Sequence, residues 1–302
     1  MIQLGSHAIH LGDCIEVLPK YDVPVADLII ADPPYFKVVG EKWDHLWRTE
    51  QDYLDWSRKW IEAAYWKLRT GGSFYLFGYF RMLALMLPIL REIGFTLRQQ
   101  IVISKGMKAV AGRATKNYKM FPCVTESVLF LTRDNISFSR QLLKDRQKEL
   151  GLTAKEINEA LGVKSNGGGM WSIYTGNNVC EQFPTKELWE KLQEILKFTY
   201  PYDDIAQTWH PQMGLTDVWN DIDFYAEKRW HPTQKPLKLI ERIMSSSSNP
   251  GDIVIDPFGG SGSTLIAAEH LGRKAVVIEF DEKYVNAMQE RFTLEGKSCI
   301  MN

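Results

Sequence analysis

Short apolar runs alternate with longer amphipathic stretches at both ends of the chain. Residues 25–31 form an apolar run of strand length, which is typical of a parallel strand covered on both faces. Similar runs predict further strands at residues 8–11, 73–77, 102–104, 127–132, 253–256 and 275–280. Apolar residues at helical spacing predict helices at residues 52–68, 82–93, 237–244, 261–271 and 281–292. This alternation predicts an α/β fold with right-handed crossovers and a parallel sheet.

The middle of the chain has a different pattern, without apolar runs of strand length. Two short amphipathic helices are predicted at residues 140–150 and 153–161, and a longer one at residues 186–198. Thr153 and Glu156 have the spacing of a capping box, which favours a helix that begins after Thr153. The pattern therefore predicts that a helical segment interrupts the α/β domain.

The change of pattern sets the expected domain boundaries. We expect one α/β domain built from residues 1–139 and 211–302, with a helical insertion over residues 140–210. The spacing within residues 142–163 is similar to that of a helix-turn-helix.

Composition and charge narrow the class of protein. The 302 residues carry a net charge of −1, and 45% are hydrophobic, which excludes disorder, collagen-like repeats and a coiled coil. Because 36 basic side chains nearly balance 37 acidic ones, any nucleic acid must be bound by a local basic patch. The longest apolar run, residues 82–90, is far shorter than the roughly 20 residues of a membrane span.

The N-terminus and the cysteines point to a soluble, intracellular protein. No basic region followed by an apolar stretch opens the chain, so no signal peptide is predicted. Cys14, Cys123, Cys180 and Cys299 are widely spaced, which favours neither a disulfide framework nor a zinc site and fits a reducing cytosol. We expect no metal ion.

A glycine-rich segment joins a predicted strand to a predicted helix near the C-terminus. It reads Asp-Pro-Phe-Gly-Gly-Ser-Gly-Ser-Thr over residues 256–264, and such a turn leaves backbone N–H groups free for a ligand. Glu279 ends the next strand, where a doubly wound fold binds ribose hydroxyls. A P-loop would need Lys before Ser263, and Gly262 stands there. The segment favours a nucleoside-containing cofactor; a tight turn with a structural acid is the alternative.

A second candidate site directly follows the first long strand. Asp32, Pro33, Pro34 and Tyr35 lie at the carboxyl end of that strand, where open α/β sheets bind ligands. The two prolines make a rigid turn whose carbonyl groups we expect to be unpaired. A carboxylate, carbonyl acceptors and an aromatic ring suit a planar amine. The alternative is a loop-starting turn without a function.

The order of three motifs identifies a family. With His-Pro-Thr-Gln-Lys-Pro at residues 231–236 between the two candidate sites, the chain resembles the β-group DNA amino-methyltransferases. Smaller matches are Gly12, Asp13 and Cys14, then Trp43 and Asp44. The resemblance implies a Rossmann-like, S-adenosylmethionine-dependent methyltransferase fold. Its motif order is circularly permuted, with the catalytic turn first and the cofactor loop last.

The resemblance also assigns roles to the catalytic turn. Asp32 and the Pro33 carbonyl would accept hydrogen bonds from the target amino group, and Tyr35 beside Pro34 would stack on a base flipped out of the duplex. The amine would then attack the sulfonium methyl group directly, without a covalent enzyme intermediate. Asp at position 32, where some relatives have Ser, favours adenine N6 over cytosine N4.

For the cofactor, the resemblance implies three groups of contacts. Asp256 would hold the methionine ammonium, Thr233 and Lys235 its carboxylate, and Glu279 the ribose hydroxyls. The adenine would lie between Phe280 and Asp13. The full set of expected cofactor residues is Asp13, Cys14, His231, Thr233, Lys235, Asp256, Phe258, Gly259, Gly260, Ser261, Gly262, Ser263, Thr264, Glu279 and Phe280.

The expected DNA contacts lie in two segments. No acidic residue occurs between Glu92 and Glu126, a stretch whose single sign of charge suits phosphate binding. Its basic side chains are Arg98, Lys105, Lys108, Arg113, Lys116 and Lys119. The helical insertion, which looks similar to helix-turn-helix segments of phage proteins, would bring Ser165, Asn166 and Tyr174 to base edges.

Several interpretations stay open at this point. The leading one is a site-specific DNA adenine-N6 methyltransferase, cytoplasmic and encoded by a prokaryote or a phage. Cytosine-N4 methylation is an alternative, as is a non-catalytic DNA-binding regulator that only senses a nucleoside. A nicotinamide-dependent oxidoreductase would leave Asp32 and its neighbours without a role. Besides DNA, a homodimer and a cognate restriction endonuclease are partners that the resemblance leaves open, and no membrane is expected.

Overall fold

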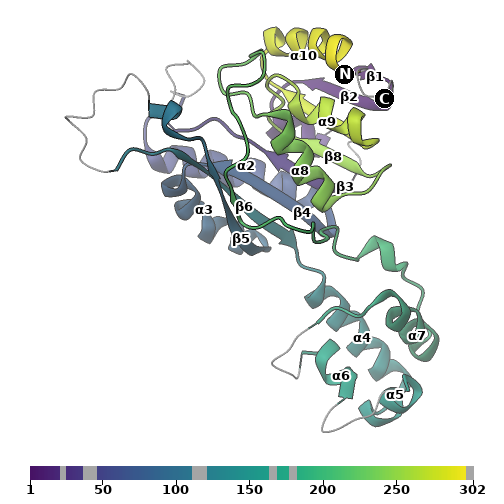
Figure 1. Ribbon diagram of the computed structural model, residues 1–302. Coiled ribbons are helices and arrows are strands. Elements are labelled where there is room, and N and C mark those ends of the chain that lie inside the picture. Colours follow the sequence, from purple (N-terminus) through teal and green to yellow (C-terminus); the bar gives the residue numbers. More distant parts are fainter. Residues whose placement is uncertain (21–24, 37–45, 111–120, 163–168, 177–181, 297–302) are drawn as a thin grey trace. The chain divides into compact units, whose positions relative to one another are not determined.

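The computed structural model describes residues 1–20, 25–36, 46–110, 121–162, 169–176 and 182–296 (Figure 1). The chain divides into two compact units. One consists of Met1–Arg133 and Thr208–Asn302, and the other of Asp134–Gln207. The boundaries of the helical insertion expected from the sequence, at residues 140 and 210, each lie a few residues C-terminal to those of the structure.

The larger unit is built on a mixed nine-stranded sheet within the described residues. Its strands are ordered β1-β2-β9-β8-β3-β4-β6-β5-β7. Their bounds are β1 Ile2–Leu4, β2 His7–Leu11, β3 Ala26–Ala31, β4 Leu68–Gly78, β5 Phe95–Ser104, β6 Thr125–Arg133, β7 Val218–Trp219, β8 Ile253–Asp256 and β9 Lys274–Glu279.

Helices cover both faces of this sheet (Figure 1). One face carries α1 Cys14–Lys20, α2 Glu50–Lys67 and α3 Phe80–Ile93, and the other carries α8 Leu237–Ser247, α9 Ser263–Leu271 and α10 Glu282–Glu295. Strand β3 shows how the sequence divides between them. Ile29 and Ala31 pack in the first core, whereas Leu28 and Ile30 pack in the second. Because successive side chains of a strand point to opposite faces, an unbroken apolar run is what two covered faces require.

The Rossmann-like α/β fold predicted from the sequence is confirmed, with one correction to the sheet. Strands β2, β9, β8, β3 and β4 are parallel, as expected. Strand β6, however, pairs antiparallel with both β4 and β5, and β1 pairs antiparallel with β2. The described residues between β5 and β6 contain one short 3-10 helix, Met107–Val110, and the two strands run in opposite directions.

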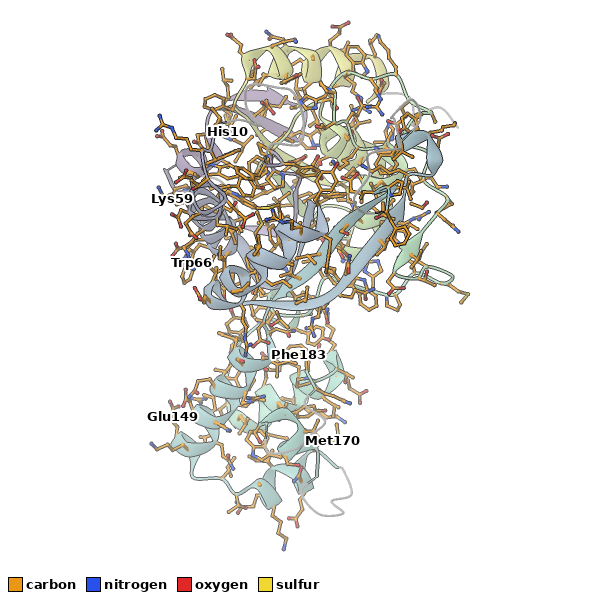
Figure 2. All side chains as sticks on the ribbon, turned by 90° about the vertical axis from the view of Figure 1, so that its left-hand side faces the viewer. His10, Lys59, Trp66, Glu149, Met170 and Phe183 are labelled. Carbon is orange, nitrogen blue, oxygen red and sulfur yellow. The ribbon has the colours of Figure 1, made fainter. Side chains whose placement is uncertain are left out.

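In the larger unit, the α-helix α1 and the strands β1 and β7 were not predicted. Each is brief and lies beside a longer partner, so its apolar residues give too short a pattern to read along the chain. Helix α2 also begins earlier than predicted, because Thr49 and Asp52 form a capping box at its start. Charged side chains on the outer face of this helix, such as Lys59, point away from the sheet (Figure 2).

The smaller unit is helical and has its own core. Its helices are α4 Ile136–Leu150, α5 Ala154–Ala160, α6 Gly169–Tyr174 and α7 Lys186–Leu196. Leu143, Ile157 and Trp189 are fully buried at its centre. The predicted capping box at Thr153 is confirmed, since the Thr153 hydroxyl accepts from the Glu156 N–H and the Glu156 carboxylate accepts from the Thr153 N–H.

Among the helices that the structure describes, none combines the length and the apolar character that crossing a membrane requires.

Candidate active site

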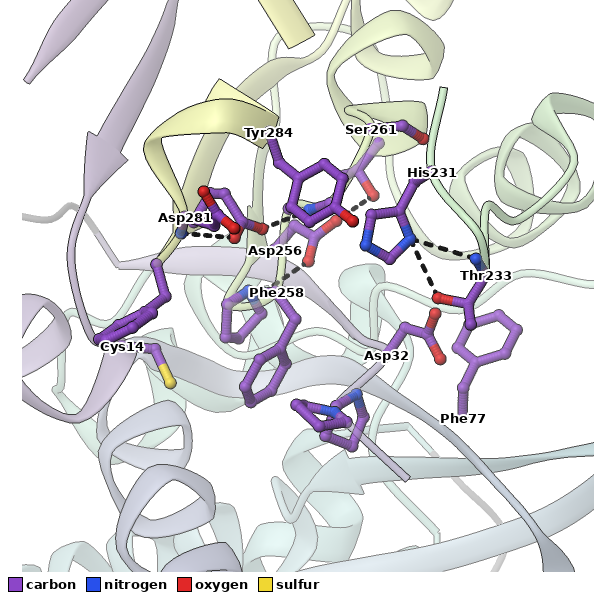
Figure 3. A pocket seen from close by; sticks show the side chains of 18 of the residues that line it. Cys14, Asp32, Phe77, His231, Thr233, Asp256, Phe258, Ser261, Asp281 and Tyr284 are labelled. Carbon is purple, nitrogen blue, oxygen red and sulfur yellow. Dashed lines mark hydrogen bonds between the residues drawn. The ribbon is translucent and has the colours of Figure 1, made fainter. Parts of the chain in front are cut away.

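A cavity of about 710 Å³ lies in the larger unit, at the carboxyl ends of β3 and β8. These strands are neighbours, with Leu28 paired to Val254, so Asp32 after β3 and Asp256 at the end of β8 reach the same edge of the sheet. Open α/β sheets bind ligands at such an edge, where the chain changes from one face to the other. The cavity is lined by all four residues of the predicted catalytic turn and by every predicted cofactor residue except Gly262. Figure 3 shows part of this lining, including Asp32, His231 and Asp256.

The turn after β3 is tied down by tyrosine hydroxyl groups. The Tyr35 hydroxyl lies 2.9 Å from Asp32 Oδ1 and 2.8 Å from Glu126 Oε1, in hydrogen-bond geometry toward both. The Tyr53 hydroxyl donates to the Pro34 carbonyl at 2.9 Å. This corrects the expectation of an unpaired carbonyl group at Pro34, since no pattern along the chain indicates that α2 brings a tyrosine to it.

A buried lysine lies between two carboxylates beside this turn. Lys235 Nζ is 2.5 Å from Asp32 Oδ2 and 3.0 Å from Glu126 Oε1, and Lys105 Nζ is 3.0 Å from Glu126 Oε2. Lys235 was expected to hold the cofactor carboxylate. In the structure its ammonium group contacts the catalytic turn, and the expected cofactor contact stays a prediction.

Burial and these charges displace the pKa values in the cluster. Burial raises the pKa of Asp32 against the opposing effect of Lys235, and it raises the pKa of Tyr35 well above its usual value. Burial alone would also raise the pKa of Glu126, but Lys235 and Lys105 lower it to about 2. Glu126 is therefore the carboxylate that stays ionised at any ordinary pH, and Asp32 is the one that takes up a proton more readily.

The glycine-rich loop between β8 and α9 is folded tightly around Glu279. The Gly260 N–H donates to Glu279 Oε2 at 2.7 Å, and the Asp281 N–H donates to Glu279 Oε1 at 2.8 Å. Gly262, at the start of α9, has a φ of +78°, which disfavours other residues. It packs against Met288 rather than lining the cavity, so its role is to shape the loop.

Asp256 ends β8 and is held by its own loop. Its Oδ1 accepts from the Phe258 N–H at 2.9 Å, and its Oδ2 accepts from the Thr264 hydroxyl at 2.6 Å (Figure 3). Burial raises the pKa of Asp256 to about 7. A cation beside this carboxylate would stabilise its ionised form.

The segment before α8 contributes a neutral histidine, His231, to the cavity. His231 Nδ1 accepts from the Thr233 N–H at 3.2 Å, and its ring lies 4.2 Å from that of Tyr284. Burial lowers the pKa of His231 to about 4. The imidazole is therefore uncharged at neutral pH.

Behind the cavity wall, Arg291 joins the two cofactor segments. It is only 1% exposed and donates to Ser263 Oγ at 3.0 Å, while the Ser263 hydroxyl donates to the Lys235 carbonyl at 2.8 Å. The carboxylates of Glu227 and Glu295 form ion pairs with the same guanidinium group. Sequence reasoning missed these residues, because an arginine within an amphipathic helix usually lies on its solvated face.

The residues that line the cavity fit the expected cofactor. Asp13, Asp256 and Glu279 offer carboxylate oxygens, which suit an amino group, an ammonium group and a ribose diol respectively. Phe280 is 75% exposed at the rim, so its ring face is open to a flat base. Burial raises the pKa of Cys14, which makes its thiol an apolar part of the wall.

The predicted DNA-contact residues differ in their exposure to solvent. Arg98 and Lys108 are exposed, and Arg98 also donates to Thr132 Oγ1. Tyr174 is 2% exposed in the core of the helical unit, so the expectation that it contacts a base edge is wrong. Lys105 is 22% exposed and is paired with Glu126, and its phosphate contact stays a prediction. The remaining predicted contacts lie outside the described residues: Arg113, Lys116, Lys119, Ser165 and Asn166.

Glu126 is the most consequential residue that sequence reasoning missed. It is 5% exposed and touches Tyr35, Lys105 and Lys235. Its signal was present, because a single acid stands at the start of the apolar run of β6, and a buried carboxylate needs a partner. In the described part of the chain, no group of three or more histidine, cysteine or acidic side chains could hold a metal ion.

Comparisons with known proteins agree with this geometry. Residues 26–290 match the model of a DNA methylase family. The chain is 26% identical to the DNA adenine methyltransferase YhdJ of Escherichia coli, covering 91% of this chain and 78% of that protein. It is 25% identical to the type II methyltransferase M.HpaI of Haemophilus parainfluenzae, covering 94% and 73% of the two chains.

Two solved structures share the fold. A putative DNA modification methylase from Thermus thermophilus, complexed with S-adenosylmethionine, is 22% identical with a TM-score of 0.58, covering 97% of this chain and 95% of that one. The M1.HpyAVI complex with S-adenosylmethionine is 19% identical with a TM-score of 0.58, covering 94% and 98%.

The family model spans most of the chain and includes the catalytic turn and the cofactor loop. The resemblance inferred from these motifs is thereby confirmed, and the chain belongs to the DNA methylase family.

Proposed function

We propose that this DNA methylase transfers a methyl group from S-adenosylmethionine to the exocyclic N6 of adenine at specific DNA sites. The observation that carries the proposal is that the Asp32 turn and the glycine-rich cofactor loop line the same cavity. The relative named as a DNA adenine methyltransferase supports adenine as the target base.

The residues of the turn supply what the reaction needs from the protein. The adenine amino nitrogen is a poor nucleophile, because its lone pair is delocalised into the ring. Hydrogen bonds from its two N–H groups to Asp32 and to the Pro33 carbonyl would favour a pyramidal nitrogen with a directed lone pair. When bound, S-adenosylmethionine supplies an electrophilic methyl group. Asp32 must be ionised to act as the stronger acceptor.

The target base must leave the duplex to reach a cavity of this kind. Tyr35 lines the cavity, and its ring would pack against the flipped base. We assign phosphate contacts to the exposed Arg98 and Lys108, and recognition of the DNA sequence to the helical unit. A homodimer and a cognate restriction endonuclease are the further partners we propose, the latter because two relatives are named type II methyltransferases.

Identification of the methylated nucleoside tests the proposal. The protein is incubated with labelled S-adenosylmethionine and mixed-sequence DNA, which is then digested to nucleosides. We expect N6-methyladenine. N4-methylcytosine would overturn the choice of base, and DNA that stays unlabelled would overturn the activity.

An Asp32→Ala variant tests the assigned role of the catalytic turn. Losing the acceptor should lower kcat by at least about a hundredfold, because substrate positioning contributes that much. The affinity for S-adenosylmethionine, measured by calorimetry, should change by less than about threefold. Asp55→Ala, on the exposed face of α2, is the matched control and should leave both quantities unchanged. A large loss of cofactor affinity in Asp32→Ala would contradict the role.

A further inference from the structure

We propose that Glu126 is a positioning residue for methyl transfer: it competes with Asp32 for the Tyr35 hydroxyl and for the Lys235 ammonium, and so leaves Asp32 free to accept from the target amine. This role rests on the proposed function. Glu126 lies on β6, outside all the motifs of the sequence, and it does not line the cavity.

The first support is a count of hydrogens. The Tyr35 oxygen is within 3 Å of a carboxylate oxygen on each side, at 2.9 Å from Asp32 and 2.8 Å from Glu126. A phenol has one hydrogen, so it donates to one of these carboxylates at a time. When a target N–H occupies Asp32, Tyr35 has Glu126 as its alternative acceptor. Asp32 then gains a donor without leaving a buried hydroxyl unsatisfied.

The second support is the division of charge. Lys235 Nζ contacts Asp32 Oδ2 and Glu126 Oε1, and its side chain is only 7% exposed. If Lys235 paired with Asp32 alone, its N–H groups would compete with the target amine for the carboxylate oxygens of Asp32. Glu126 accepts one of the hydrogen bonds of this ammonium group and so reduces that competition. Lys105, which is 22% exposed, balances the second negative charge from the solvent side.

The protonation of Asp32 is the measurable consequence. The charged and titratable groups around it are Tyr35 of the same turn, Lys235 before α8, Glu126 of β6 and Asp256 of β8. Burial raises the pKa of Asp32, Lys235 lowers it, and the negative charge of Glu126 raises it further. Removing that charge should therefore lower the pKa of Asp32 and move the acidic limb of the kcat profile to lower pH.

The test compares Glu126→Gln with the wild-type protein in kcat, in KM for DNA and in the pH profile of kcat. We expect kcat to fall roughly ten- to hundredfold, because a neutral amide pairs with Lys235 less strongly than the carboxylate does and so leaves more of the ammonium group to Asp32. The acidic limb should shift to lower pH. KM and the affinity for S-adenosylmethionine should change by less than about threefold, since Glu126 lies outside the cavity.

Two further variants separate this role from a general loss of structure. Glu126→Asp keeps the charge but shortens the side chain, so it should lower kcat while leaving the acidic limb close to that of the wild type. Glu92→Gln makes the same change on an exposed pair with Arg58, and it should behave as the wild type does. If Glu126→Gln does not fold, Glu126→Asp decides, and a wild-type kcat in that variant would overturn the role.

The outcomes are distinguishable. An active wild type whose Glu126→Gln variant keeps kcat within about twofold overturns the positioning role alone. A fall in kcat with an unmoved acidic limb also overturns it, because a purely structural defect would do the same. A wild-type protein that transfers no methyl group to DNA overturns the proposed function and this role with it.

Discussion

Asp256 shows how one residue makes cofactor affinity depend on pH. Its pKa is raised to about 7 by burial, and the proposed cofactor brings an ammonium group that pairs with the ionised form. Below pH 7 binding must displace a proton from Asp256, so the affinity for S-adenosylmethionine should fall by up to about tenfold per pH unit. Above pH 7 the carboxylate is already ionised, and the affinity should level off.

Calorimetry between about pH 5.5 and 8.5, a range that brackets the pKa of Asp256, measures this dependence. Asp256→Asn keeps an acceptor for the Thr264 hydroxyl but removes the titrating group. It should bind more weakly at pH 8 and lose the pH dependence. Asp55→Asn, on the outer face of α2, is the control. A wild-type affinity that is flat across this range would contradict a carboxylate–ammonium pair at Asp256.

Some residues of the site could be predicted from the sequence, and others could not. Asp32 and Asp256 could be predicted because each directly follows an apolar strand, and parallel strands bring their carboxyl ends together. The pairing of Lys235 with Asp32 spans 203 positions of the chain, and no periodicity records it. Arg291 was missed because a single sequence does not show that the residue is buried. Glu126 stands out as the one acid in the apolar run of β6, but its partners, distant along the chain, could not be predicted.

At the scale of elements, two glycines that flank α9 separate two reasons for needing glycine: a positive φ, and the absence of room for a Cβ atom. Gly262 and Gly272 begin and end this helix, with φ of +78° and +70°. A Cβ at Gly262 would lie 2.4 Å from Met288 Cγ, whereas one at Gly272 would meet nothing closer than 3.9 Å. Alanine at either position therefore strains the backbone by a similar amount, about 1–2 kcal/mol, but only alanine at Gly262 also clashes with Met288.

We expect Gly262→Ala to weaken binding of S-adenosylmethionine by at least about tenfold, because the loop must shift to relieve Met288. Gly272→Ala should lower the free energy of unfolding while leaving the cofactor affinity within about threefold of the wild type. Thermal unfolding and calorimetry on both variants make the comparison. Equal affinities in the two variants would show that the packing of Gly262 does not shape the site.

The elements themselves were largely predictable where their patterns were long. Strand β3 and helix α2 are close to their expected ranges, because an apolar run and a helical period each mark a buried surface. The direction of β6 was not predictable in this way. An apolar run shows that a strand is buried, but only the connection from β5 decides whether it runs parallel or antiparallel.

At the scale of the whole molecule, the two units divide the chemistry from the proposed recognition of sequence. Each unit has a hydrophobic core of its own, and the cavity is lined only by residues of the larger one. The ends that flank the helical unit lie close together. Thr132 is paired with Ser73 across the sheet, and Thr208 Oγ1 lies 2.8 Å from Ser73 Oγ. A short flexible linker can therefore join Arg133 to Thr208 without disturbing the sheet.

We expect a variant in which such a linker replaces Asp134–Gln207 to fold and to bind S-adenosylmethionine within about threefold of the wild-type affinity. Because the helical unit is assigned to sequence recognition, this variant should lose its preference among DNA sites while retaining slow transfer to adenine. Sequencing of methylated DNA from the wild type and the variant checks this. If the variant methylates the same sites with the same preference, then recognition resides in the larger unit, whose exposed Arg98 and Lys108 are the described basic residues to examine next.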